Sequence, residues 1–311
     1  MGGLDVVAVG ELNPDLILDG VAGLPRLGRE ILADRATFTL GSSTALCAAN
    51  LAALGLRVGI VGKVGEDLFG DFVLQSLRER GIDASRVIRD PAVRTGVTVS
   101  LAYPQDRAMV TFPGAMAFLR GEEVDLAYLS EARHLHVSSF FLQQALQPGC
   151  AALFRAAKER GLTTSLDPGW DPEAQWDAGI AGLYPWLDVL FVNQVEAAAL
   201  GGNAEWRKAA DSLAGQVSTV VVKRGREGAG AMYHGTWHEH PGFPVEAADP
   251  TGAGDAFNAG FLFGRLSSLQ PRLCLRWGNA CGALTASRPG GSGAFSNRAD
   301  VEGFIRARHE F

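Results

Sequence analysis

The sequence lacks the features that mark membrane, secreted and nucleic-acid-binding proteins. No stretch approaches the roughly 18 consecutive apolar residues that a membrane-spanning helix requires. The first residues carry neither the basic nor the apolar segment of a signal peptide, and they carry no myristoylation signal. The formal net charge is −6, and Lys and Arg form no basic block. These absences predict a cytoplasmic protein that binds neither a membrane nor nucleic acid.

Cysteine is scarce, and the histidines do not form a convincing metal site. The chain has only four cysteines, which are Cys47, Cys150, Cys274 and Cys281. Their wide spacing suits neither a disulfide framework nor a zinc site, so reduced thiols are expected. His234, His238 and His240 fall in an expected surface hairpin, and we interpret them as surface residues. His134 and His136 alternate with apolar residues in an expected strand, which indicates a structural role.

Apolar, strand-like runs alternate with helical patterns over most of the chain. We expect strands at 6–10, 58–61, 134–137, 163–166, 189–192 and 219–222, and helices near 44–54, 68–80, 148–160, 204–215, 254–268, 271–287 and 298–309. This alternation is typical of βαβ units. It predicts an α/β fold with a central, mostly parallel sheet flanked by helices. No repeat or linker divides the chain, so 1–311 is expected to form a single domain.

Two regions, about 11–40 and 93–113, break this alternation. Each contains short runs in which apolar and polar residues alternate, as in Val97-Thr98-Val99-Ser100-Leu101. Such alternation is typical of half-exposed antiparallel strands. The two regions could form one small sheet over the carboxyl edge of the main sheet, or separate surface hairpins.

The stretch 249–261, Asp-Pro-Thr-Gly-Ala-Gly-Asp-Ala-Phe-Asn-Ala-Gly-Phe, carries the strongest functional signal. A glycine-rich turn ends a strand-like run, and helical spacing begins directly after it. The backbone N–H groups of Gly252, Ala253 and Gly254 are therefore predicted to face an anion such as phosphate. Asp255 lies within one turn of that anion, where it suits a base that deprotonates a nucleophilic hydroxyl. The alternative is an ordinary turn before a helix with a stabilising carboxylate.

The same stretch closely resembles the signature of the ribokinase-like (PfkB) carbohydrate kinase family, Asp-Thr-x-Gly-Ala-Gly-Asp-x-Phe-x-x-Gly. Pro250 at the Thr position is a modest departure. The resemblance extends over nearly the whole chain, and it implies that the small sheet is a lid that closes over a sugar. It also implies transfer of the γ-phosphoryl group of ATP to a hydroxyl, with Asp255 as the base.

Two segments resemble the parts of this family that bind the sugar. Asn13 and Asp15 follow the first expected strand, where the family has an Asn-x-Asp that hydrogen-bonds sugar hydroxyls; turn chemistry is the alternative. The segment that contains Gly41, Ser42 and Leu46 resembles the family's Gly-Gly-x-x-Ala-Asn. Ser42 replaces the second glycine, and Leu46 replaces an Asn that contacts a sugar hydroxyl. The apolar Leu46 cannot make that contact, so ribose is not assigned as the substrate.

Other segments resemble the parts of the family that bind ATP. Asn193 and Glu196 match its Asn-x-x-Glu, which organises Mg²⁺-bound water and the ATP phosphates; a helix capping box is the alternative. Lys223, Arg224 and Gly225 resemble the strand end and turn at the nucleotide site, where the two cations either meet phosphate or remain solvated. Residues 278–283 resemble the segment that lines the adenine pocket, with Asn279 beside the base or in a tightly packed helix.

One segment departs clearly from the family pattern. Residues 167–171 read Asp-Pro-Gly-Trp-Asp, where the family often has Asp-x-Asn-x-Arg. Asp171 is a poor partner for an anionic substrate, which argues against phosphorylated and acidic sugars.

We therefore expect an ATP-dependent sugar kinase that acts on a primary hydroxyl of a monosaccharide or polyol. ATP and Mg²⁺ are the expected cofactors, activation by a monovalent cation such as K⁺ is left open, and a homodimer through the lid is favoured. A nucleoside kinase of the same family and a non-catalytic sugar or nucleotide sensor are the alternatives. A phosphofructokinase-like enzyme would need a basic pocket, for which the candidates are Arg26, Arg29, Arg35 and Arg107. A dinucleotide-binding oxidoreductase is disfavoured because Phe257 stands where Gly-x-Gly-x-x-Gly needs its third glycine.

Overall fold

An eight-stranded sheet forms the centre of the protein in the computed structural model, which describes residues 3–103, 107–288, 293 and 295–308. In spatial order its strands are β14 (Thr236–His240), β13 (Ala229–Tyr233), β12 (Thr219–Lys223), β11 (Val189–Asn193), β10 (Thr163–Asp167), β9 (Ala132–Ser138), β1 (Leu4–Val9) and β4 (Val58–Val61). All neighbours from β12 to β4 pair in parallel, whereas β13 and β14 form an antiparallel hairpin at one edge. The predicted α/β fold with a mostly parallel sheet is confirmed.

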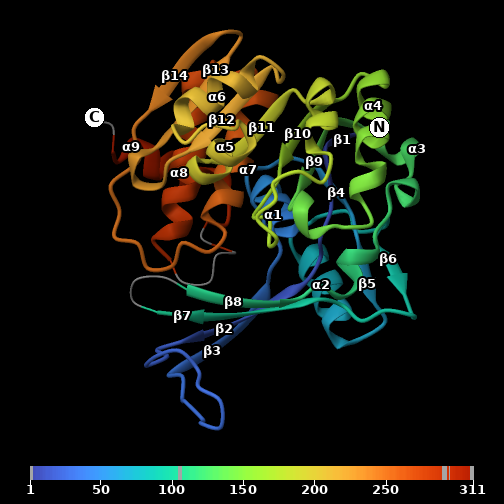
Figure 1. Ribbon diagram of the computed structural model, residues 1–311, viewed down its shortest axis with the longest axis vertical. Helices are drawn as coiled ribbons and strands as arrows, with labels where there is room; N and C mark the ends of the chain where they lie inside the picture. Colours follow the sequence, from blue (N-terminus) through green and yellow to red (C-terminus); the bar gives the residue numbers. More distant parts are fainter. Residues whose placement is uncertain (1–2, 104–106, 289–292, 294, 309–311) are drawn as a thin grey trace.

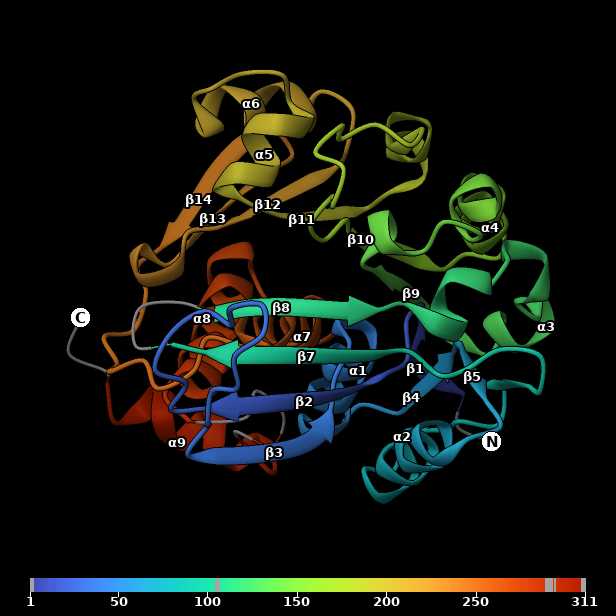
Figure 2. The same cartoon turned by 60° about the horizontal axis from the view of Figure 1, so that its bottom comes forward.

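Helices cover both faces of this sheet, which explains its continuous apolar strands. One face packs against α1 (Ser43–Ala53), α2 (Leu68–Glu79), α7 (Ala253–Leu266), α8 (Pro271–Ala286) and α9 (Arg298–Arg306). The other face packs against α3 (Leu126–Leu129), α4 (Gln147–Glu159), α5 (Gln194–Leu200) and α6 (Trp206–Ala214). Successive residues of β1 serve the two cores in turn, with Val6 on one side and Val7 on the other. Figure 2 shows α5 and α6 on one side and α7 and α8 on the other.

Small residues bring α7 close to α8. A Cβ added to Gly260 would lie only 2.5 Å from the Trp277 carbonyl oxygen, and one added to Gly264 would lie 3.0 Å from the Cα of Cys274. Both glycines therefore permit a backbone approach that larger residues would prevent. This packing holds the start of α7, and with it Asp255, at the carboxyl edge of the sheet.

A separate four-stranded sheet lies below this edge (Figure 1), and we call it the lid. Its strand order is β3 (Arg35–Leu40), β2 (Pro14–Asp19), β7 (Val97–Ala102), β8 (Arg107–Phe112). The two pieces predicted from alternation therefore join in one sheet, through the parallel pairing of β2 with β7. Phe38 of β3 packs against Phe69 and Phe72 of α2, with ring centroids 5.6 and 4.5 Å apart, and so attaches the lid to the main body.

Some short elements were not predicted. β5 (Lys63–Gly65) and β6 (Ile88–Asp90) form a two-stranded sheet, and the short helix α3 precedes β9. Elements of three or four residues carry too little periodicity for prediction from sequence. In the described part of the chain, none of the helices has the length and apolarity that crossing a bilayer demands.

Candidate active site

The turn before α7 has the conformation that its glycines suggested. Gly252 is the N-cap of α7 with φ 72°, a left-handed conformation that favours glycine. The Thr251 N–H donates to Asp249 Oδ1 at 2.8 Å and organises the turn from within. The Ala253 N–H donates to the Pro250 carbonyl at 3.2 Å, so in this conformation it is committed to the turn and not turned towards an anion. The predicted anion site accordingly depends most on Gly252 and Gly254.

Asp255 follows in the first turn of α7, where other carboxylates surround it. Burial raises its pKa well above the usual range, and the charges of Asp167 and Glu11 raise it further. Lys223 and a hydrogen bond from Ser43 oppose this shift. A carboxylate with a raised pKa is a stronger proton acceptor once ionised, which suits the role predicted for Asp255.

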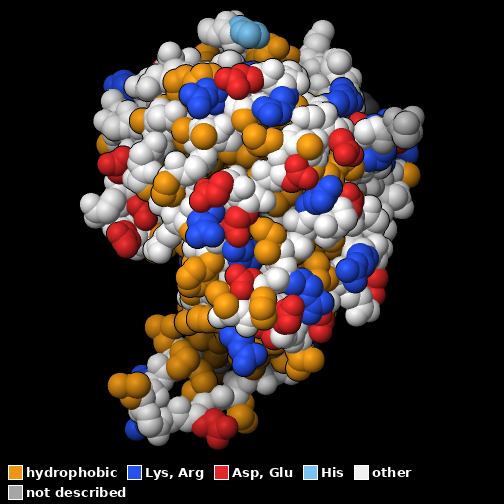
Figure 3. Space-filling model, turned by 90° about the vertical axis from the view of Figure 1, so that its right-hand side faces the viewer, with side chains coloured by type: hydrophobic (Ala, Val, Ile, Leu, Met, Phe, Trp, Pro, Cys, Tyr) orange, Lys and Arg blue, Asp and Glu red, His pale blue; other side chains and the backbone are white. Residues whose placement is uncertain are grey.

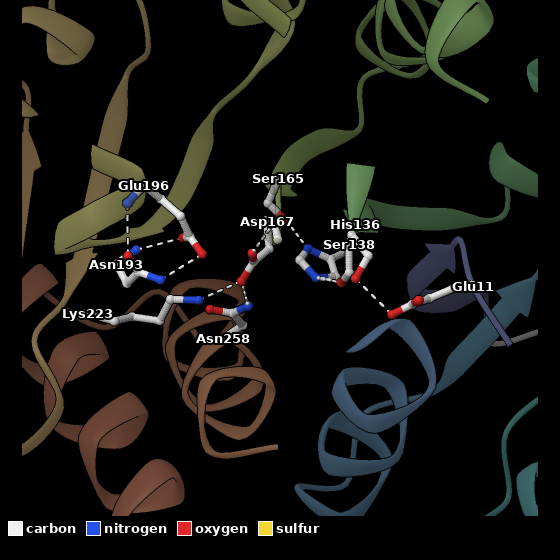
Figure 4. Close-up of polar contacts among 11 residues, drawn as sticks. Glu11, His136, Ser138, Ser165, Asp167, Asn193, Glu196, Lys223 and Asn258 are labelled. Atoms are coloured by element: carbon white, nitrogen blue, oxygen red, sulfur yellow. Dashed lines mark hydrogen bonds and ion pairs between the residues drawn. The ribbon is translucent and has the colours of Figure 1, made fainter. Parts of the chain in front are cut away.

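A buried ion pair lies behind this turn, at the ends of β10 and β12 (Figure 4). Lys223 Nζ lies 2.6 Å from Asp167 Oδ2, and Asn258 Nδ2 donates to the same oxygen at 2.6 Å. Burial alone would raise the pKa of Asp167, but the ammonium group and these hydrogen bonds hold it below its ordinary value. Asn258 lies one helical turn after Asp255, so α7 contributes to both groups. Lys223 lines the adjoining cavity, where it can meet an anion.

Asn193 and Glu196 form a complete capping box at the start of α5. The Asn193 N–H and Nδ2 donate to the two oxygens of Glu196 at 2.8 and 2.7 Å, and Asn193 Oδ1 accepts from the N–H groups of Val195 and Glu196. Burial and the charge of Asp167 raise the pKa of Glu196 to about 7, against the effect of Lys223. The capping interpretation is therefore confirmed. It leaves lone pairs on a carboxylate that faces the Asp167–Lys223 pair.

Asn13 and Asp15 lie at the junction of the main sheet and the lid. Asn13 Nδ2 donates to Asp15 Oδ1 at 3.4 Å and to Thr98 Oγ1 at 3.3 Å, while its buried Oδ1 has no partner among the described residues. Burial and the Glu11 carboxylate raise the pKa of Asp15 to about 7. A Cβ on Gly41 would collide with the Asp15 carboxylate, so this glycine makes room for it. The unused acceptor on Asn13 suits a hydroxyl donor from a ligand.

Ser42 and Leu46 have structural roles in the described structure. Ser42 Oγ accepts from the Ala45 N–H at 3.3 Å and donates to the Glu11 carbonyl at 2.8 Å, so it caps α1. The Leu46 side chain is buried at 4% exposure. Ser42 Oγ is thus used in capping and Leu46 is apolar, so neither offers a free polar group to a ligand.

A cavity of about 700 Å³ lies between the lid and the main body. Its lining includes Arg107 from the lid, Thr251 and Gly254 from the turn, and Lys223, Gly225 and Asn279 from the main body. Asn279 Nδ2 donates to the carbonyl oxygens of His240 and Pro241 at 3.1 and 3.2 Å. Of the residues predicted for ATP, Lys223, Gly225, Gly254 and Asn279 line this cavity, and Asn193, Arg224 and Gly252 are not in its lining.

Arg224 does not belong to this lining. Its guanidinium lies over the Trp206 ring, 5.7 Å from the centroid, and pairs with Glu239 at 3.8 Å. Of the two cations predicted to meet phosphate, Lys223 therefore lines the cavity and Arg224 does not. Asp171 is also used locally, because its carboxylate accepts the N–H groups of Glu173, Gln175 and Trp176.

Sequence reasoning missed several residues of the site. Glu11 accepts from the Ser43 N–H at 2.7 Å and from Ser139 Oγ at 2.8 Å, and Asp167 holds Lys223. Glu11 and Asp167 both stand at or directly after the carboxyl end of a parallel strand, where ligands bind in such sheets. That position was the available signal. For Asn258 the signal was its helical spacing from Asp255.

Comparison with known proteins identifies the family. Residues 4–298 match the model of the pfkB family carbohydrate kinases. The chain belongs to this family. It is 34% identical over 290 residues to an ATP-dependent ribose-1-phosphate kinase of Halopiger xanaduensis, covering 93% of this chain and 94% of the relative. It is 30% identical over 320 residues to fructokinase-2 of Zea mays, covering 96% and 93% of the two chains.

Solved structures show the same fold. A ribokinase from Thermotoga maritima superposes with a TM-score of 0.83 at 26% identity, covering 97% of this chain and 99% of the ribokinase. The predicted ribokinase-like fold is confirmed, as is the prediction of an ATP-dependent sugar kinase, a phosphotransferase with an alcohol group as acceptor.

Proposed function

We propose that Asp255 is the general base of this sugar kinase and accepts the proton of the sugar hydroxyl that attacks the γ-phosphoryl group. The observation that carries this proposal is the position of Asp255 in the first turn of α7, beside the Gly252 turn and the Asp167–Lys223 pair. Gly252, Gly254 and, after a local rearrangement, Ala253 offer backbone N–H groups to the charge on the transferred group. Because the transition state is loose, positioning and electrostatics contribute more than base strength does.

ATP would occupy the cavity between the lid and α8, with Asn279 beside the base and Gly225 close to the nucleotide. Lys223 supplies positive charge behind the turn, where a Cβ on Gly254 would lie 3.6 Å from its Nζ. For Mg²⁺, Asn193 and Glu196 are the candidate residues, and Glu196 would act through water. A single carboxylate is sufficient because Mg²⁺ keeps much of its water shell and also binds the phosphates. Bound Mg²⁺ would stabilise the ionised form of Glu196, whose pKa is about 7 without it.

The acceptor would bind between Asn13, Asp15 and Gly41, under the lid. Asn13 Oδ1 and the Asp15 carboxylate accept hydrogen bonds, so they suit adjacent hydroxyls of a monosaccharide or polyol. Four carboxylates, those of Glu11, Asp15, Asp167 and Asp255, lie in this part of the site, which disfavours an anionic group near the reacting hydroxyl. Closure of the lid would exclude water and limit ATP hydrolysis.

We also propose that the lid pairs with the lid of a second copy of this chain. Large apolar side chains are exposed on and beside it, among them Ile31, Phe38, Met109, Val110 and Phe112. Hydrophobic side chains gather over the lid in Figure 3. Exposed apolar patches on a small sheet commonly mark an interface. Sedimentation of the protein, beside a Val110→Glu variant, would detect the dimer and its loss.

The activity is tested by ATP turnover with Mg²⁺ across neutral sugars, polyols, sugar phosphates, sugar acids and nucleosides. Each assay is run with K⁺ and with tetramethylammonium, which reports activation by a monovalent cation. The Asp255→Asn variant should lose about 10²–10⁴-fold in kcat and keep its affinity for ATP. Asp71→Asn is a matched control, because Asp71 lies in the first turn of α2 and is exposed. Normal turnover of Asp255→Asn would contradict the proposal, and preference for a nucleoside would move the substrate to the alternative class.

A further inference from the structure

Arg107, the first residue of β8, connects the lid to the turn before α7. Its Nη1 donates to Thr251 Oγ1 at 2.9 Å, across 144 positions of sequence. Thr251 directly precedes Gly252, and its N–H is held by Asp249 Oδ1. One guanidinium group therefore joins an edge strand of the lid to the turn that would face the transferred phosphoryl group.

The acidic groups around this contact favour a positive charge at the position of Arg107. Arg107 and Thr251 line the same cavity as Lys223 and Gly254. The charge of Lys223 is largely balanced by Asp167 at 2.6 Å. Arg107 opposes the effect of burial and of Glu11 on Asp15, and so favours the ionised form of that carboxyl group. It is thus a second cation at an acidic site, and it is carried by the lid.

Within the turn, the Thr251 N–H and the Ala253 N–H are held by Asp249 Oδ1 and the Pro250 carbonyl, and the Arg107 contact adds a support from outside. Gly252 has a left-handed φ of 72°, and glycine has more conformational freedom than any other residue. An error of about 1 Å in a reacting group can cost about a hundredfold in rate. A hydrogen bond from the lid to Thr251 would restrict this turn only while the lid is closed over the site.

We propose that Arg107 is a positioning residue that couples lid closure to the order of the 249–254 turn, through the hydroxyl of Thr251. The inference rests on the proposed function of that turn. It predicts that the enzyme is competent for phosphoryl transfer only when the lid is closed and water is excluded.

A double-mutant cycle tests the coupling. Arg107→Met removes the donor, and Thr251→Val removes the acceptor hydroxyl with little change of shape. Each single variant should lower kcat by about 10–100-fold. The double variant should be no slower than the worse single variant, because both remove the same interaction. Arg107→Lys should give an intermediate loss, since an ammonium group keeps the charge but not the geometry of the guanidinium group.

A second readout separates positioning from sugar binding. Both single variants should raise the ratio of ATP hydrolysis to sugar phosphorylation, because the turn and the lid are no longer coupled. Arg35→Met is the matched control, since Arg35 is on lid strand β3 and its pair with Asp19 is long, at 3.8 Å, with the Arg35 side chain 74% exposed. Additive effects of Arg107→Met and Thr251→Val would overturn the proposal. So would a rise only in the KM for sugar with Thr251→Val unaffected, because Arg107 would then be a substrate ligand.

Amide hydrogen exchange keeps the test independent of turnover. With a non-hydrolysable ATP analogue bound, Arg107→Met and Thr251→Val should each speed exchange in both β8 and the 249–254 turn. If the wild-type enzyme phosphorylates no sugar, the proposed function fails, while this exchange pattern still decides whether the two segments are coupled. Faster exchange in one segment only, or in neither, would overturn the coupling.

Discussion

Two groups of buried polar side chains lie on the same sheet but differ in what they can still bind. The first comprises Asp167 and Lys223, the last residues of β10 and β12, and Glu196 in the first turn of α5, and we call it the charged group. The second runs through β9 and β10 as a chain of hydroxyl and imidazole side chains, and we call it the histidine chain. Its members are Thr163, His134, Ser165, His136 and Ser138. Figure 4 shows the charged group beside one end of the histidine chain.

The four ring nitrogens of the histidine chain are all used in its own hydrogen bonds. Ser165 Oγ lies 2.7 Å from His134 Nε2 and 2.7 Å from His136 Nδ1. Its one proton can serve only one of these nitrogens, so the other ring must donate to it. The two neutral rings must therefore be the same tautomer, with the proton of each ring on Nε2 or the proton of each ring on Nδ1. The remaining ring nitrogens bond Thr163 and Ser138, which leaves no ring nitrogen for a ligand.

The charged group retains capacity for a ligand. Lys223 lines the cavity, and the buried Asn258 Oδ1, beside Asp167, has no partner among the described residues. Glu196 keeps lone pairs beyond its capping contacts. Perturbed pKa values occur in both groups, so burial alone does not distinguish a site from a structural element. A site is distinguished from a structural element by its contact with a cavity and by polar groups that still lack a hydrogen-bond partner.

Of the substitutions that test this comparison, Lys223→Met is expected to have the largest effect on stability and activity. Removal of the cation leaves Asp167 as an uncompensated buried charge, which should lower the free energy of unfolding by about 3–5 kcal/mol. Phosphoryl transfer should fall as well. Adding Asp167→Asn should restore much of the stability but not the activity, as measured by urea unfolding and ATP turnover.

Lys158→Met provides the control for this change. Lys158 pairs with Asp188 at 2.8 Å, but its side chain is 35% exposed, so the loss of stability should be smaller than for Lys223→Met. Turnover should remain normal in this variant. Equal destabilisation by the two substitutions would argue that Lys223 is an ordinary ion-pair partner.

A smaller effect, on stability alone, is expected from Ser165→Ala. The substitution removes the hydroxyl that bridges both imidazoles and leaves two buried ring nitrogens without their partner. This should cost about 1–3 kcal/mol in free energy of unfolding. Because both imidazoles are fully hydrogen-bonded within the histidine chain, kcat should stay close to the wild-type value. A large fall in kcat with unchanged stability would instead place the chain in the reaction.

The same comparison explains how far sequence could lead. The sheet, its helices and the turn before α7 depend on local periodicity and on closely spaced glycines, and these were predictable. His134 and His136 were interpreted as structural because they alternate with apolar residues in one strand, and both rings are buried and hydrogen-bonded. In each of these cases, the residues that carry the signal lie within a few positions of one another in the sequence.

Contacts across the sheet could not be predicted in this way. Lys223 reaches Asp167 over 56 positions, and Asn258 reaches the same carboxylate over 91. Arg107 meets Thr251 over 144 positions, although the sequence had placed it only among candidates for a basic pocket. Arg224 is the opposite case. Its place next to Lys223 in the sequence suggested a phosphate contact, but in the fold its guanidinium group contacts Trp206 and Glu239 instead.

The smallest net effect is expected in how stability depends on pH, because Asp15 and His136 act on it in opposite directions. Burial and Glu11 raise the pKa of Asp15 to about 7, so the folded protein keeps a proton that the unfolded chain has lost above pH 4. This contribution makes the free energy of unfolding fall as pH rises from about 4 to 7. Burial lowers the pKa of His136 to about 4, so there the unfolded chain carries the extra proton up to about pH 6.5. This contribution makes stability rise with pH.

Two variants should separate these slopes. Asp15→Asn removes the falling contribution, so the free energy of unfolding should rise more steeply between about pH 4 and 6.5 than in the wild type. His136→Gln removes one rising contribution and should flatten or reverse that slope, whatever its effect on stability at any single pH. Urea unfolding at several pH values within this window measures both. If both variants shifted the slope in the same direction, the pKa of Asp15 would not be raised while that of His136 is lowered, and the prediction would be wrong.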